Sequence, residues 1–150
     1  MNRKPITLIT GATSGIGESC TRKFAQAGFD LIITARREDC LQKQKMELER
    51  LGIRVLPLAF DVQDRMAARQ AIESLPDDWK EIDVLVNNAG LARGLEPEYE
   101  GNEEDWDEMI DTNIKGLLTM TRLIVPGMVA RNHGHIINIG SVAGDAAYAG

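Results

Sequence analysis

Short apolar runs alternate along this chain with longer stretches of helical period. The strand-length runs are 6–9, 31–35, 54–60, 82–86 and 134–139. The helical stretches are 16–27, 38–51, 64–75 and 104–131. Parallel strands that are buried on both faces read as continuous apolar runs, and right-handed crossovers place helices on both sides of the sheet. The sequence therefore predicts an α/β fold with a doubly wound parallel sheet, built as a single domain of 150 residues.

Two residues are expected to define helix boundaries. Asp64 is placed to cap the third helix, because its carboxylate can accept hydrogen bonds from free N–H groups of the first turn. Pro126 is expected to kink or divide the last helix, because proline lacks the backbone N–H that a helix interior uses. Residues 91–102, with two glycines and one proline, are expected to be irregular.

A glycine-rich segment, Thr10–Gly17, lies between the first strand and the first helix. Glycine in this context allows a tight turn, a close approach of the backbone to a pyrophosphate and close strand–helix packing. The helix N-terminus then presents free N–H groups and its positive dipole end to the phosphates. A glycine turn without a ligand is the alternative interpretation. The candidate cofactor-binding residues of this segment are Gly11, Ala12, Thr13, Ser14, Gly15, Ile16 and Gly17.

The end of the second candidate strand indicates which dinucleotide this site selects. NAD-selective sites of this kind usually carry an acidic side chain there, bonded to the ribose 2′-hydroxyl. This chain has Arg36 and Arg37 instead, after Thr34 and Ala35. Guanidinium groups suit a 2′-phosphate. The alternative is that both arginines are solvated residues at the start of the next helix, but cations are unfavourable at that end of the helix dipole. The sequence predicts NADP(H), with Arg36 as the principal contact.

Three motifs carry a resemblance to a known family. They are the TGxxxGxG pattern of Thr10–Gly17, the NNAG sequence Asn87–Gly90 after the fourth strand, and Ile139–Ser141 after the fifth. In order and spacing they are similar to short-chain dehydrogenases/reductases, and the resemblance covers essentially the whole chain. It implies a Rossmann-type fold that is truncated here after the fifth strand, so that residues 1–150 form a single NADP-binding domain.

The resemblance also implies roles for individual residues. Asp61 and Val62 correspond to the pair that contacts adenine, and Asn88, followed by Ala89 and Gly90, to a contact near the adenine-side ribose. In this family, hydride passes between the nicotinamide and a carbon that bears oxygen. Ser141 corresponds to the serine that holds the substrate oxygen, and Asn113 to the asparagine that positions a water of the proton relay. A strand-end cap for Ser141 and a helix-surface amide for Asn113 are the alternatives.

The family's proton-exchanging tyrosine is expected beyond this chain. It follows the serine by roughly thirteen residues, and a lysine that lowers its pKa follows roughly four residues later on the same helix face. Both positions fall after Gly150. Tyr148, seven residues after Ser141, is expected to line the substrate loop rather than to replace that tyrosine. The 150 residues alone are therefore expected to be catalytically inactive or nearly so.

Four segments indicate a branch of the family. They are Leu91–Pro97, Asp111–Asn113, Pro126–Val129 and His133–Ser141. They resemble bacterial NADP-dependent 3-hydroxy acid dehydrogenases, a branch that includes serine, L-allo-threonine and 3-hydroxypropionate dehydrogenases. The resemblance implies interconversion of a 3-hydroxy acid with a semialdehyde or ketone. A generic carbonyl or 3-oxoacyl reductase, a non-catalytic NADP(H)-binding module and a non-functional remnant remain as alternatives.

Composition narrows the partners. A formal net charge of −6 argues against nucleic acid as a partner, because proteins that bind nucleic acid need basic patches. No apolar run approaches the ~20 residues of a membrane span, and the first residues lack the features of a signal peptide, so a cytoplasmic protein is expected. Cys20 and Cys40 have no metal spacing, and His133–His135 is expected to be a turn into the fifth strand, so no metal site is predicted.

The remaining partner expectation is a second copy of the protein. The family commonly forms dimers or tetramers through the long helix and the helix that carries tyrosine and lysine, so a homo-oligomer is implied for the complete protein. Without those later elements, part of the sheet and the apolar face of the 105–131 helix are expected to be exposed and to promote association.

Overall fold

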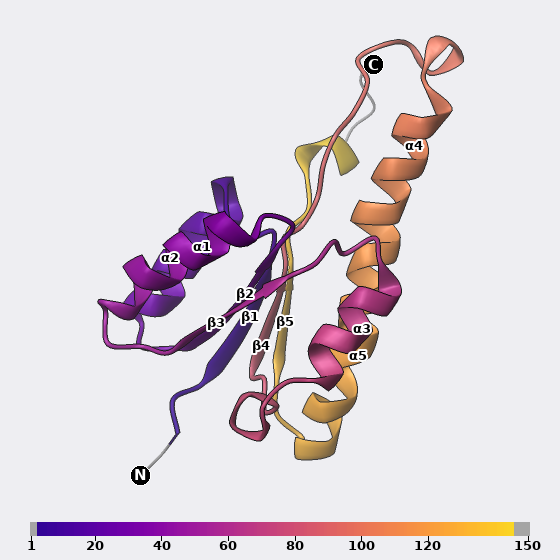
Figure 1. Ribbon diagram of the computed structural model, residues 1–150. Coiled ribbons are helices and arrows are strands. Elements are labelled where there is room, and N and C mark those ends of the chain that lie inside the picture. Colours follow the sequence, from indigo (N-terminus) through magenta and orange to yellow (C-terminus); the bar gives the residue numbers. More distant parts are fainter. Residues whose placement is uncertain (1–2, 146–150) are drawn as a thin grey trace.

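The computed structural model describes residues 3–145 and contains a five-stranded parallel sheet in the order β3-β2-β1-β4-β5. The strands are β1 (Ile6–Thr10), β2 (Asp30–Ala35), β3 (Val55–Ala59), β4 (Val84–Asn87) and β5 (His135–Asn138). The helices are α1 (Gly15–Gln26), α2 (Glu38–Glu49), α3 (Arg65–Glu73), α4 (Glu103–Ile110) and α5 (Leu117–Arg131). Figure 1 shows α1 and α2 on one face of the sheet and α3 with the α4–α5 column on the other. The predicted doubly wound α/β fold is confirmed.

The alternation of side chains along the central strand explains the two-sided core. On β1, Ile6 and Leu8 pack into the cluster that contains Met120 of α5, while Ile9 belongs to the cluster that contains Leu41 of α2. Successive residues of a strand point to opposite faces, so a strand covered on both sides has no solvent-facing position. Every residue of β1 is accordingly buried.

The strand order places a topological switch point at β1. The chain moves outward from β1 to β2 and β3, and then returns to the other side of β1 as β4 and β5. Loops that follow β1 and β4 therefore leave the sheet in opposite directions, and a crevice opens between them at the carboxyl ends of the strands. This crevice is where a ligand site is expected in an open α/β sheet.

The predicted long helix differs from expectation at one place. Pro126 lies inside α5 and does not divide it, because Met120, Ile124 and Met128 hold the helix in the core on both sides of the proline. The irregularity lies earlier, where Asp111–Gly116 forms a π-helical segment between α4 and α5. The predicted cap is confirmed: the Asp64 carboxylate accepts hydrogen bonds from the N–H groups of Met66 and Ala67.

One apolar surface of the described residues is open to solvent. On β5, which forms the edge of the sheet, Ile136 is exposed together with the polar residues His135 and Asn138. The α4–α5 column adds a line of exposed large apolar side chains: Trp106, Ile110, Ile114, Leu118 and Val129. The exposure predicted for this helix and for part of the sheet is confirmed. None of the helices within residues 3–145 combines the length and apolarity needed to cross a membrane.

The amino ends of the strands are tied together by a buried carboxylate. Asp83, just before β4, accepts hydrogen bonds from the Ile6 N–H at 2.8 Å and from Nη1 and Nη2 of Arg3 at 2.7 and 2.8 Å. Burial alone would raise the pKa of Asp83, but the hydrogen bonds from Arg3 and Ile6 outweigh it and hold that pKa below its usual range. The charged form of Asp83 thus stabilises the pairing of β1 with β4.

We predict that Asp83→Asn lowers the free energy of unfolding by about 1–2 kcal/mol at pH 7, because the amide keeps an acceptor for Ile6 but loses the charged pair with Arg3. A carboxylate with a depressed pKa contributes stability above its unfolded pKa and loses that contribution as pH falls through the folded pKa. The difference in free energy of unfolding between wild type and Asp83→Asn should thus become smaller below about pH 4. Urea denaturation at several pH values measures it.

The matched control is Glu81→Gln, which removes the exposed carboxylate that binds the same guanidinium. Its effect should stay within about 0.5 kcal/mol, as for other exposed ion pairs. Two results would contradict the stabilising role of charged Asp83: an Asp83→Asn variant as stable as Glu81→Gln at pH 7, or a stability difference between wild type and Asp83→Asn that grows in acid.

Candidate functional site

A cleft of about 960 Å³ opens at the carboxyl ends of the strands. Most of the residues predicted for the cofactor site and both predicted catalytic residues line it: Gly11, Thr13, Ser14, Ile16, Arg36, Arg37, Asp61, Val62, Asn88, Ala89, Gly90, Asn113 and Ser141. Ala12, Gly15 and Gly17 do not line it; Ala12 and Gly17 are buried beneath the turn. The topology therefore brings together three motifs that are separated by up to about 130 residues in the sequence.

The glycine-rich turn depends on close backbone contacts. A Cβ on Gly17 would overlap the carbonyl oxygen of Gly11 and Nδ2 of Asn88, so no other residue fits there without a shift of the backbone. Gly11 and Gly15 have φ of +62° and +54°, which L side chains rarely adopt. The first turn of α1 consequently lies directly against the end of β1.

Asn88 of the NNAG motif clamps this turn. Its Nδ2 donates to the carbonyl oxygens of Thr10 and Gly11, each at 3.0 Å. The Thr10 hydroxyl in turn accepts the N–H groups of Asn88 (3.1 Å) and Ala89 (3.0 Å). The side-chain nitrogen of Asn88 is thus used within the protein, while its predicted contact to the adenine-side ribose stays a prediction. The role of Thr10 was not found from the sequence, although a threonine that ends a buried strand is a usable signal.

The two arginines lie at the β2 side of the cleft. Arg36 is 64% exposed, and its Nη1 stands 3.9 Å from Asp61 Oδ2, a distance typical of a weak, screened pair. Arg37 immediately precedes α2. Apart from Asp61, every described residue that lines the cleft lacks an acidic side chain. This part of the cleft can therefore accept an anionic group.

The opposite wall is the π-helical segment. Asn113 uses both ends of its amide on Leu91: Oδ1 accepts the Leu91 N–H at 2.9 Å, and Nδ2 donates to the Leu91 carbonyl at 2.8 Å. This pair fixes the segment after the NNAG motif against the helix. π-Bulges are frequently found at functional sites, because they change which backbone groups a helix satisfies internally.

The loop after β3 packs on the same segment. Gln63 Nε2 donates to the Thr112 hydroxyl at 2.8 Å, and a Cβ on Gly116 would come within 2.9 Å of Val62 Cγ2. The predicted adenine-contacting residues are thereby connected to the helix that carries Asn113. Neither contact was predicted from the sequence.

Ser141 stands at the rim beyond β5. Its Oγ accepts the Ala143 N–H at 3.1 Å, which caps a short 3₁₀ turn (Val142–Gly144) and leaves the hydroxyl proton available for donation. The hypotheses of a strand-end cap and of a substrate-holding hydroxyl are thus compatible. Tyr148 lies outside the described residues.

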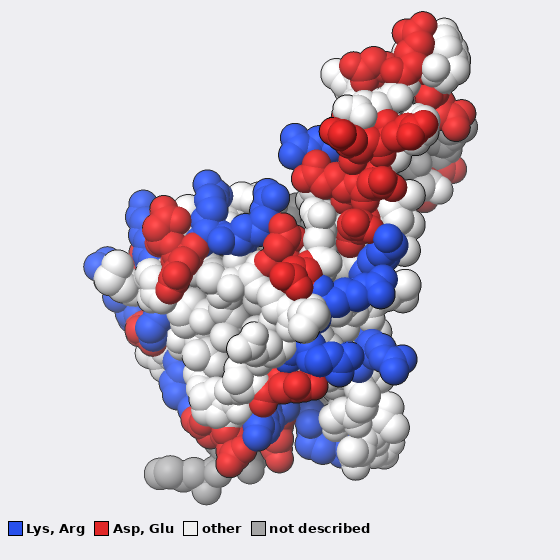
Figure 2. Space-filling view, turned by 45° about the vertical axis from the view of Figure 1, so that its right-hand side comes forward, with Lys and Arg blue, Asp and Glu red and all other residues white. Residues whose placement is uncertain are grey.

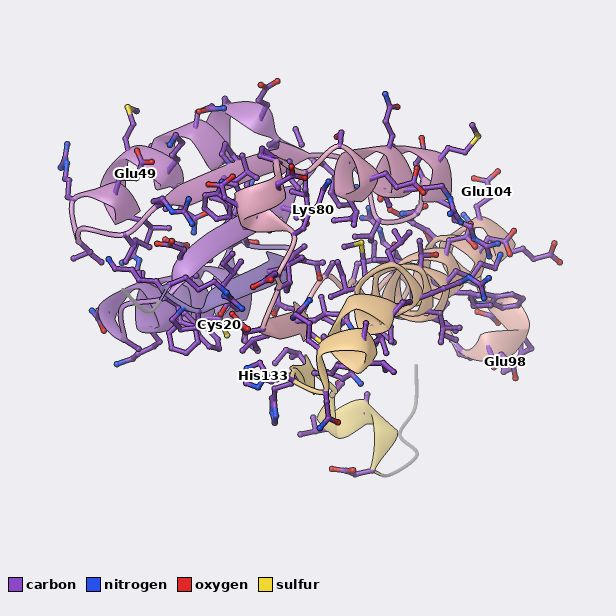
Figure 3. All side chains as sticks on the ribbon, turned by 90° about the horizontal axis from the view of Figure 1, so that it is seen from below. Cys20, Glu49, Lys80, Glu98, Glu104 and His133 are labelled. Atoms are coloured by element: carbon purple, nitrogen blue, oxygen red, sulfur yellow. The ribbon has the colours of Figure 1, made fainter. Side chains whose placement is uncertain are left out.

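Charge is unevenly distributed around the cleft. Figure 2 shows acidic side chains gathered on the projecting end formed by residues 91–102 and α4. In Figure 3, Glu98 and Glu104 lie at this end, while Cys20 and Glu49 lie at the opposite end of the molecule. Within residues 3–145, no three His, Cys, Asp or Glu side chains are grouped so as to hold a metal ion. Both cysteines are free and half-buried.

Comparison with known proteins identifies the family. The family model for short chain dehydrogenases matches residues 5–150. The chain belongs to the short-chain dehydrogenase family. The Rossmann-type arrangement of its strands and the clustering of its three motifs at one cleft agree with that membership.

Relatives and solved structures of this family are similar to the chain over nearly its whole length. The NADP-dependent 3-hydroxy acid dehydrogenase YdfG of Escherichia coli K12 is 54% identical over 145 residues, which cover 97% of this chain and 57% of the relative. Sulfoacetaldehyde reductase 2 of Chromohalobacter salexigens is 44% identical over 146 residues, covering 97% and 58%. The closed form of a serine dehydrogenase complexed with NADP+ matches with a TM-score of 0.92 and 54% identity, covering 97% and 57%. This short-chain dehydrogenase chain thus spans a little over half the length of these proteins.

We predict that Gly17→Ala lowers the free energy of unfolding by about 2 kcal/mol or more, because the added methyl group displaces α1 from the Gly11 carbonyl. Gly144→Ala, where a Cβ meets no atom within 4 Å, should change it by less than about 0.5 kcal/mol. Denaturant unfolding of both variants measures the difference. Equal stabilities would show that the turn and α1 are not in the contact described.

Proposed function

We propose that this chain is the NADP(H)-binding part of an NADP-dependent oxidoreductase of the short-chain dehydrogenase type. The observation that carries the proposal is one cleft that combines a glycine-rich turn at a helix N-terminus with Arg36 and Arg37. Backbone N–H groups at a helix start bind phosphates, and guanidinium groups bind a 2′-phosphate better than a hydroxyl. The NADP-dependent names of its relatives support the same cofactor.

The residues of the cleft fit a dinucleotide. Gly11 and Gly17 leave no room for side chains, so a phosphate can approach the turn closely. Arg36 and Arg37 would hold the 2′-phosphate, Asp61 and Val62 the adenine, and the segment Asn88–Gly90 the adenine-side ribose region. When bound, the cofactor supplies or accepts the hydride.

Two residues of this chain act on the substrate side. Ser141, with its oxygen held by the Ala143 N–H, would donate its proton to the substrate oxygen and orient the reacting carbon. Asn113, fixed to Leu91, would hold the helix so that a water can join the proton relay. The general acid and base would be the family's tyrosine, assisted by its lysine, at positions beyond residue 150. We therefore propose that the 150 residues bind cofactor without turnover.

The proposed substrates are small 3-hydroxy acids or the corresponding carbonyl compounds. The relatives are named for 3-hydroxy acids, serine and sulfoacetaldehyde. In each of these compounds one carbon separates the hydroxyl- or carbonyl-bearing carbon from an acidic group. Most of the substrate pocket would come from later residues, so a generic carbonyl or 3-oxoacyl reductase is the second candidate within the same chemistry.

Two further proposals concern the complete protein. Catalysis is favoured over a non-catalytic NADP(H)-binding module, because Ser141 and Asn113 line the same cleft and a pure binder has no chemical need for both. For the complete protein we propose a homo-oligomer, as the resemblance to the family implies; the exposed apolar line on α4 and α5 is a surface that a second copy or later residues of the protein would cover. Light scattering that finds only a monomer would contradict the oligomer.

The function is tested by a chimera in which residues 1–150 are followed by the part of the E. coli 3-hydroxy acid dehydrogenase beyond its matched region. We predict that the chimera oxidises serine or 3-hydroxypropionate with NADP+, while residues 1–150 alone show no turnover. Ser141→Ala in the chimera should lower kcat by about 100-fold or more, because the hydroxyl orients and polarises the reacting oxygen.

The control variant is Ser19→Ala, an exposed serine of α1, which should leave kcat unchanged. A folded chimera that binds NADPH but has no activity would contradict the proposal. So would a Ser141→Ala variant with the activity of the Ser19→Ala variant.

A further inference from the structure

A buried amide on α2 contacts the glycine-rich turn from outside the cleft. Gln44 is only 8% exposed, and its Nε2 donates to the Ala12 carbonyl and to the Thr21 hydroxyl, each at 2.9 Å. Ala12 O can only accept, and the Thr21 hydroxyl already donates to the Glu18 carbonyl at 2.7 Å. Both partners therefore require the NH₂ group, which fixes the orientation of the Gln44 amide.

This contact determines which way one peptide of the turn faces. In a trans peptide the C=O and the following N–H point in opposite directions. Because Gln44 holds the Ala12 carbonyl toward the protein interior, the Thr13 N–H is directed to the opposite side, and Thr13 lines the cleft. Within residues 3–145 this N–H makes no hydrogen bond. It is therefore a free donor that faces the ligand site.

The free donor lies on the arginine side of the cleft. The preceding residue, Ala12, donates its own N–H to the Thr34 carbonyl at 3.0 Å, and Thr34 precedes Arg36 by two positions on the same strand end. Helix α2 begins directly after Arg37 and carries Gln44 on its second turn. One buried hydrogen bond thus ties the helix that follows the arginines to the turn that carries the Thr13 N–H.

Core packing alone would not favour a glutamine at position 44. Gln44 lies on the buried stripe of α2 between Leu41 and Leu48, and its Oε1 is buried without a partner among the described residues. A leucine there would remove the unpaired Oε1 from the core, but it would leave the Ala12 carbonyl without its donor. The amide is therefore explained by its donor function rather than by core packing.

We infer that Gln44 is a positioning residue for NADP(H) selectivity: by holding the Ala12 carbonyl, it aims the Thr13 N–H at the adenosine 2′-phosphate, next to Arg36 and Arg37. The inference rests on the proposed function. It assigns part of the cofactor preference to a side chain that does not line the cleft.

The test is to titrate the 150-residue chain and its variants with NADPH and with NADH and to measure the dissociation constants by calorimetry. In Gln44→Leu the dissociation constant for NADPH should rise about tenfold or more, because a charge-assisted hydrogen bond to phosphate is lost. The constant for NADH, which has no 2′-phosphate, should stay within about twofold. Arg36→Ala should show the same split, and Gln42→Leu, an exposed residue of the same helix, should show no change for either.

Thermal melts accompany the titrations. The melting temperature of Gln44→Leu should lie within about 5 °C of wild type, because the unpaired Oε1 and the hydrogen bond to Ala12 are lost together. If Gln44→Leu does not fold, Gln44→Met, which keeps the length of the side chain but has no donor, takes its place.

Two kinds of failure are distinguishable. Equal loss of NADPH and NADH affinity, or no loss of either, in a folded Gln44 variant overturns the inference and leaves the proposed function intact. A wild-type chain that binds neither dinucleotide, or prefers NADH, overturns the proposed function and the inference with it.

Discussion

The close approach of α1 to the end of β1 is the contact on which the site depends. It is possible because position 17 carries no side chain, and it is held by Asn88, whose amide binds the carbonyls of Thr10 and Gly11. Carbonyl groups captured in this way leave N–H groups of the turn and of the helix start directed toward the cleft. The anion-binding character that we propose for the cleft therefore follows from how the protein satisfies its own backbone hydrogen bonds.

The two ends of the sheet are stabilised by different means. At the amino ends, buried carboxylates such as Asp83 and Asp30 bind Arg3 and Arg54, respectively, and fix neighbouring strands together. At the carboxyl ends, threonine and amide side chains make neutral hydrogen bonds with backbone groups of the glycine-rich turn and the NNAG motif. A cleft without strong ion pairs keeps its cationic groups available, and Arg36 has only a distant partner in Asp61. The charged groups that stabilise the sheet thus lie at its amino end, and the proposed ligand-binding groups lie at its carboxyl end.

Local pattern predicted the fold and the location of most site residues, because apolar runs, glycine placement and motif spacing are visible in the sequence. It did not predict contacts between elements distant in the chain, such as Gln63 with Thr112 or Gln44 with Ala12. The expected division of the last helix at Pro126 was wrong, because tertiary packing holds α5 together through the proline. The π-helical segment Asp111–Gly116 was not recognised in the sequence. A polar residue on a buried helical stripe, as at Gln44, is a signal that sequence analysis can use.

Arginine and backbone N–H donors should hold the adenosine 2′-phosphate in this cleft as a dianion, and ³¹P NMR of NADP+ bound to the 150-residue chain tests this most directly. A free phosphate monoester has a second pKa of about 6. Guanidinium and N–H donors favour the charged form and lower that pKa. We predict a 2′-phosphate resonance that hardly moves between about pH 8 and pH 5. A bound 2′-phosphate that titrates near pH 6, as in free solution, would contradict it.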